Sequence, residues 1–149
     1  MQAPRAEVVL VLSRSRSVTP ADRGNYDLIE AGLQRFIRFD KPQHFPGRAA
    51  LLDTQTRGPA RRFVALIVDA GAAEPPSMSP LVHDGDTVGA VTSAAWGHRV
   101  RASVALAMVR ADLAKPGAQL EVESFGKLHR AVVQPECAVW DPSNARMRA

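Results

Sequence analysis

The chain has 149 residues, 46% apolar and 23% charged, which is the composition of one soluble globular domain. Lysine and arginine exceed aspartate and glutamate by 19 − 15 = 4, but these basic residues do not cluster, so we expect no nucleic-acid partner. The single cysteine, Cys137, excludes an internal disulfide, and with four dispersed histidines it leaves no metal site to expect. No apolar run approaches the ~20 residues of a membrane helix, so we expect no membrane contact and a cytoplasmic location.

Residues 1–24 differ from the rest of the chain. One short apolar run, Val8 to Leu12, is followed by alternating serine and arginine. This pattern predicts an atypical, poorly ordered N-terminal tail. The apolar run is too short for a secretory signal and has no small-residue cleavage site after it.

Residues 25–60 predict a segment of turns and one short helix. Leu28, Ile29 and Leu33 fit a helical period, although the alternation in RFIRF also allows a turn followed by a short strand. The helix is expected near 47–57, because Gly47 precedes it and the Gly58-Pro59 pair stops it.

The part of the chain after residue 60 has the pattern of about five strands. RRFVALIVD (61–69) is rich in β-branched residues, and ASVALAMVRA (102–111) alternates along its length. Asp84-Gly85 predicts a turn ahead of a strand, and 118–134 predicts a hairpin that turns at 125–127. We expect Val88–Val91 and Val104–Val109 to be neighbouring strands joined by residues 93–102. Turn signals every 8–12 residues indicate a mainly β fold, a small antiparallel barrel or sandwich.

Standard catalytic signatures are absent from the sequence. No glycine-rich phosphate loop opens a helix after a strand, and no nucleophile elbow is present. Ser93 and His98 lie five residues apart without a third group to orient them, so the pair does not indicate a catalytic site. Ser93 is instead expected at a strand end, where its hydroxyl would form a hydrogen bond with a free backbone group. The residues themselves therefore identify no catalytic site.

Two segments carry a resemblance to a known family. The segment from Gly85 to Arg110, and the upstream EAGLQRFIRFDKPQHFPGRAAL (30–51), resemble the C-terminal barrel domain of the glycine-cleavage T-protein (aminomethyltransferase) superfamily. The matching positions are Glu30, Gly32, Leu33, Lys41, Phe45, Gly47, Arg48, Arg61, Arg62, Gly85, Val88, Gly89, Val91, Thr92 and Ser93. The resemblance covers about residues 25–149.

Within the superfamily, the Gly97-His98 pair and the closing DPSNARMR (141–148) are similar to the folate-linked dimethylglycine and sarcosine dehydrogenase branch. The resemblance implies that residues 61–149 form the C-terminal β-barrel and that 25–60 is a linker and helix segment from the neighbouring folate-binding domain. One departure is Ala94, which stands where the family has a glycine after Thr-Ser; any positive φ at that position would be strained.

The resemblance also implies a function and a cofactor. In the family, the barrel helps close a tetrahydrofolate site for one-carbon transfer. Relatives also use FAD, which binds to a separate flavin domain; this chain shows no flavin site. Lys41 and Arg48 are the candidate folate-binding residues, because folate carries carboxylates that a cation can meet. Trp96 and His98 are candidates for a domain-contact loop, and no residue here is assigned as catalytic.

The chain on its own allows two readings. In the first, it is a part of an enzyme that needs upstream folate-binding and flavin domains, or a partner chain carrying them, and is inactive alone. In the alternative, it is a stand-alone non-catalytic interaction module or a truncated gene product. In either case we expect apolar side chains of 26–36 that pack on a neighbouring domain in the family to promote self-association.

Overall fold

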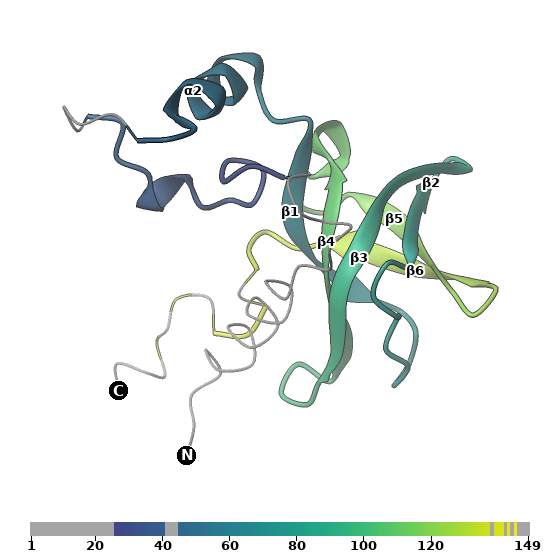
Figure 1. Cartoon of the computed structure of the whole chain (residues 1–149). Helices are drawn as coiled ribbons and strands as arrows, with labels where there is room; N and C mark the ends of the chain where they lie inside the picture. The colour runs from purple at the N-terminus through teal and green to yellow at the C-terminus, as the bar shows by residue number, and fades with distance from the viewer. Residues whose placement is uncertain (1–25, 41–44, 138, 142, 144, 146–149) are drawn as a thin grey trace.

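The computed structural model describes residues 26–40, 45–137, 139–141, 143 and 145, and it contains a closed six-stranded antiparallel barrel (Figure 1). The expected N-terminal tail, 1–24, lies outside the described residues. None of the described helices is long and apolar enough to cross a membrane. The elements in chain order are η2 (Gln34–Phe36), α2 (Arg48–Arg57), β1 (Arg61–Val68), β2 (Pro80–His83), β3 (Asp86–Gly97), β4 (Ala102–Arg110), η3 (Ala111–Leu113), β5 (Gln119–Ser124) and β6 (Lys127–Val133).

The barrel closes in the order β1-β4-β3-β2-β5-β6, and β6 pairs back onto β1. Every neighbouring pair of strands is antiparallel, so successive strands run in opposite directions along the barrel. One end of the barrel holds the start of β1 and the β2–β3 turn; we call it the arm end, because the preceding segment 26–58 joins the barrel there. At the other, the far end, lie the β3–β4 and β5–β6 turns and the loop 69–79. Closure pairs every strand on both sides, which removes exposed sheet edges.

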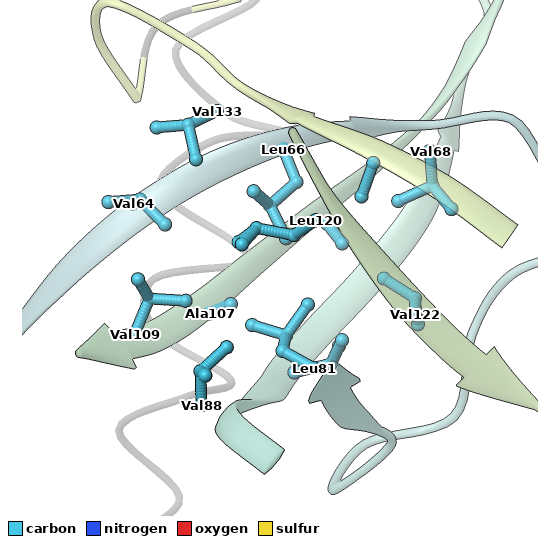
Figure 2. Close-up of a cluster of buried hydrophobic side chains, with 13 residues drawn as sticks. Val64, Leu66, Val68, Leu81, Val88, Ala107, Val109, Leu120, Val122 and Val133 are labelled. Atoms are coloured by element: carbon cyan, nitrogen blue, oxygen red, sulfur yellow. The ribbon is translucent and has the colours of Figure 1, made fainter. Parts of the chain in front are cut away.

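The interior of the barrel is a single apolar cluster, shown in Figure 2. On β4 the inward side chains Ala105 and Ala107 are small, which suits the narrow interior of a six-stranded barrel. Leu106 and Met108, on the other face of β4, are buried as well. The cluster consists of Val64, Leu66, Val68, Leu81, Val88, Val91, Ala105, Ala107, Val109, Leu120, Val122, Ala131 and Val133.

Two sequence expectations about the strands are wrong. A sixth strand, β2, was not expected, because four residues that begin with proline carry too little periodic pattern. The β3–β4 connection is also shorter than 93–102, since β3 continues to Gly97 and β4 begins at Ala102. The turn therefore covers only 98–101, and Arg101 N–H donates to Gly97 O across it at 2.6 Å.

A β-bulge in β3 explains why the strand seemed to end early. The register with β4 shifts between Val91 and Ser93, so Thr92 is the additional residue. The Thr92 hydroxyl donates to Leu106 O at 3.0 Å, and the Ser77 hydroxyl donates to Thr92 O at 3.0 Å. Ser93 lies inside the strand, so the expected strand-end role is wrong; its Oγ is buried and has no hydrogen-bond partner among the described residues.

Ala94 continues the strand without strain. It is not among the described residues with positive φ, and it packs against the barrel core. A glycine is therefore not needed at this position. Glycine or a strained residue is needed at the β2–β3 turn instead, where Asp84 and Gly85 have φ of 52° and 86°, as the Asp-Gly pair predicts.

Residues 26–58, here called the arm, precede the barrel and form no strand among their described residues. The arm begins with hydrogen-bonded turns over 27–33, followed by η2, and α2 starts directly after Gly47 and ends before Gly58, as expected. Leu51 is the buried residue of α2. In Figure 1, α2 stands away from the barrel beyond the start of β1.

Candidate functional site

The predicted folate-binding residues belong to the arm. Lys41 lies outside the described residues. Arg48 is the first residue of α2 and is half-buried; its guanidinium donates to the carbonyl of Phe39 at 3.1 Å. This bond holds the arm chain against the start of the helix. The structure therefore gives Arg48 a local partner, and its contact with folate stays a prediction.

The predicted domain-contact residues lie at the far end of the barrel. Trp96 is half-buried near the end of β3, and His98 is exposed in the 98–101 turn. In Figure 1 the β3–β4 turn and α2 lie at opposite ends of the molecule. The structure therefore does not bring Arg48 together with Trp96 and His98.

Polar and aromatic groups make contacts on and beside the β3–β4 turn at the far end. The Trp96 backbone N–H donates to the carboxylate of Glu74 at 2.9 Å, which ties the loop 69–79 to β3. The Arg99 guanidinium lies 5.0 Å from the ring centroid of Trp140, a cation–π contact. The Ser103 side chain is completely buried near this end, and its hydroxyl has no partner in the described structure. Glu74 and Trp140 were missed because each makes its contact with a residue distant in the sequence.

The arm end carries a second polar group of residues at the joint between the arm and β1. Asp27 Oδ1 accepts from the backbone N–H of Ile29 and Glu30, both at 2.8 Å, and Glu30 Oε2 accepts from Asp27 N–H at 3.2 Å. This reciprocal pattern is a capping box. Burial raises the pKa of the Asp27 carboxyl, but hydrogen bonds from the Thr54 hydroxyl and from these N–H groups outweigh it and hold the pKa below its usual range. The D-x-x-E spacing of Asp27 and Glu30 in the sequence is the pattern by which this capping box could have been recognised.

A cavity of about 150 Å³ lies behind this joint, between the arm and the barrel wall. Its apolar walls come from both sides, and its polar groups are Glu30, Arg62, Gln134, Glu136 and Cys137. Burial raises the pKa of the Cys137 thiol, so the thiol is protonated and weakly nucleophilic at neutral pH. No group of three or more histidine, cysteine, aspartate or glutamate side chains comes together as a metal site in the described part of the chain.

Taken together, the geometry defines a small closed β-barrel domain preceded by an arm. The family model of the glycine cleavage T-protein C-terminal barrel domain matches residues 61–139, which run from the first strand to beyond the last. The chain belongs to this family.

Similar proteins place the same segment within much longer chains. The chain is 34% identical over 121 residues to mitochondrial dimethylglycine dehydrogenase of Mus musculus, covering 80% of this chain and 14% of that protein. It is 41% identical over 113 residues to the aminomethyltransferase of Parasynechococcus marenigrum, covering 76% and 29%. The crystal structure of glycine cleavage system aminomethyltransferase T from Bartonella henselae matches with a TM-score of 0.64 at 27% identity, covering 72% and 30%. The chain therefore spans less than a third of each of these relatives.

Proposed function

We propose that this chain supplies the barrel of a folate-dependent aminomethyltransferase-like or dimethylglycine dehydrogenase-like protein, where it helps close a tetrahydrofolate site for one-carbon transfer. The observation that carries the proposal is the closed barrel with the family's motif residues in structural positions: Gly89 against β4 and Thr92 in the bulge. The assignment of tetrahydrofolate as the ligand comes from the family resemblance, because the family uses folate. Sarcosine is a second substrate that the resemblance allows.

The proposal assigns the chemistry to other domains. In this proposal the barrel acts by contact and by shaping the site, as the family resemblance implies. Lys41 and Arg48 are the cations we propose for the carboxylates of folate, because arginine and lysine bind carboxylates through charge-assisted hydrogen bonds. Trp96 and His98 are the proposed contacts to a neighbouring domain. The partner is a set of folate-binding and flavin domains, in the same chain or another, in the cytoplasm; FAD would bind there and not to this barrel.

The test of this function is complementation. The purified chain is expected to release no formaldehyde or methylene-folate from dimethylglycine or sarcosine. The same barrel, placed in an aminomethyltransferase that has lost its own, is expected to restore tetrahydrofolate binding.

A second candidate function, an interaction module that self-associates, is favoured by one specific observation. Tyr26, Leu28 and Phe36 of the arm have exposed fractions of 36%, 45% and 68%. Arginines lie over two of the rings: Arg61 is 5.5 Å from the Tyr26 centroid, and Arg35 is 4.7 Å from that of Phe36. Aromatic and arginine side chains are enriched in protein interfaces. Leu33, by contrast, is half-buried and contributes less surface.

Phe36→Asp is therefore expected to shift the chain toward monomer in sedimentation velocity across the micromolar range. Burying the ring contributes roughly 25 cal/mol per Å² to association, and a carboxylate at that position reverses this. Phe125→Asp is the matched control, because Phe125 is also exposed but lies on the β5–β6 turn, away from the arm. A wild-type chain that stays monomeric at every concentration would rule this candidate out.

A further inference from the structure

The attachment of the arm to the barrel depends on few apolar contacts. Ile29 and Leu51 are the buried apolar side chains among the described arm residues, whereas the barrel interior holds thirteen. Figure 1 shows α2 standing clear of the barrel strands. An arm with this little apolar burial needs polar bonds to keep its place on the barrel.

Those polar bonds converge on Glu30, which the capping box ties to Asp27. Beyond the capping box, Glu30 Oε1 accepts from the backbone N–H of Arg61 at 3.1 Å, and the Glu30 carbonyl accepts from Phe63 N–H at 2.9 Å. Asp27 in turn accepts from the backbone N–H of Ile29 and Glu30, which fixes the turn that carries Glu30. The pair Asp27 and Glu30 thus connects two segments: the turn 27–33 and the first residues of β1.

We propose that Asp27 and Glu30 form a clasp that holds the arm on β1, and that this clasp opens while the barrel stays folded. Segments with few buried apolar contacts open at much lower free energy than the core they pack on. The barrel does not depend on the clasp, because β1 is paired along its length with β4 and through Leu66–Val68 with β6. The proposal does not rest on the proposed function.

Opening of the clasp has a chemical consequence at Cys137. Ile29, Glu30 and Gly32 form the arm-side wall of the 150 Å³ cavity, and Cys137 lies on its barrel side. The thiol is half-buried and its pKa is raised by burial. When the arm leaves, the thiol gains solvent, its pKa falls toward the ordinary value and its reaction with disulfide reagents accelerates. Because Cys137 is the chain's one cysteine, it reports the opening without any added label.

The experiment measures labelling of Cys137 by 5,5′-dithiobis(2-nitrobenzoate) at pH 8 in the wild-type chain and three variants. Glu30→Ala removes the carboxylate that reaches both Asp27 and Arg61, and it is expected to label about tenfold faster, since losing a cap of this kind shifts such an equilibrium by about that factor. Glu30→Gln keeps an oxygen for the Arg61 N–H and is expected to stay within about threefold of wild type. Asp53→Ala breaks an exposed ion pair with Arg57 on α2 and is expected to change nothing.

Hydrogen exchange on the same samples separates clasp opening from general destabilisation. In Glu30→Ala, the amides of Arg61 and Phe63 are expected to exchange faster by a similar factor, while those of Leu120 and Val122 in β5 keep their protection. Unchanged Cys137 labelling in Glu30→Ala would overturn the proposal. So would an equal loss of protection in β5, because the arm and the barrel would then open as one unit.

Discussion

Replacing Gly89 with alanine is expected to lower the free energy of unfolding by ~3 kcal/mol, the largest effect of an added methyl group at any glycine that the structure describes. A Cβ at this position would overlap the carbonyl oxygen of Met108 and lie 3.0 Å from the Cα of Val109. Both atoms are backbone of β4, so no side-chain rotation relieves the contact. The strands β3 and β4 would have to separate at this point.

Urea unfolding followed by circular dichroism measures this effect, with Gly126→Ala as the control. Gly126 has φ of 74° in the β5–β6 turn, but nothing lies within 4 Å of the position where its Cβ would be. Its substitution is expected to cost ~1–2 kcal/mol, from the left-handed backbone alone. If Gly89→Ala cost no more than Gly126→Ala, the close approach of β3 and β4 would be refuted.

Truncation of Leu66 to alanine is the second large effect, expected to cost ~2–5 kcal/mol. Leu66 is completely buried in the middle of β1, and it is paired with Ala105 on one side and Val133 on the other. Because its neighbours on β4 are small and the barrel is closed, the walls cannot collapse onto the cavity. The loss should therefore fall in the upper half of the range.

The control for this truncation is Leu128→Ala, which removes the same atoms from β6. Leu128 is 55% exposed, so its truncation is expected to change the free energy of unfolding by less than ~0.5 kcal/mol. Equal losses in the two variants, measured by the same urea titration, would mean that the barrel interior is not the stabilising core.

The strands could be predicted from the sequence wherever the pattern was long and regular. β4 and the β5–β6 hairpin follow from alternation and turn residues, and α2 follows from the glycines on either side of it. β3 was cut short because the bulge at Thr92 shifts the alternation, and a shifted alternation resembles a strand end. The family resemblance predicted the barrel, and this prediction is confirmed; the strand pattern alone could not predict closure, because pairing of β6 with β1 joins segments more than sixty residues apart.

The candidate site was predictable only where its bonds are local. The two residues of the Asp27–Glu30 capping box lie three positions apart, a spacing that can be recognised in the sequence, whereas the bond from Glu30 to Arg61 cannot. The contact of Glu74 with Trp96 joins a proline-rich loop to a strand 22 residues later and has no sequence pattern. Lys41 and Arg48 came from the family resemblance, and no local pattern distinguishes them from other basic residues.

The central claim is that this barrel completes a tetrahydrofolate site, and a chimera tests it most directly. Residues 26–149 would replace the corresponding C-terminal segment of the Parasynechococcus marenigrum aminomethyltransferase, to which the chain is 41% identical over 113 residues. Calorimetry would measure tetrahydrofolate binding by the parent, the chimera and the parent without its barrel. We predict a dissociation constant for the chimera within about tenfold of the parent, a difference of ~1.4 kcal/mol, and no binding without a barrel. A chimera that unfolds as cooperatively as the parent yet binds no tetrahydrofolate would contradict the claim.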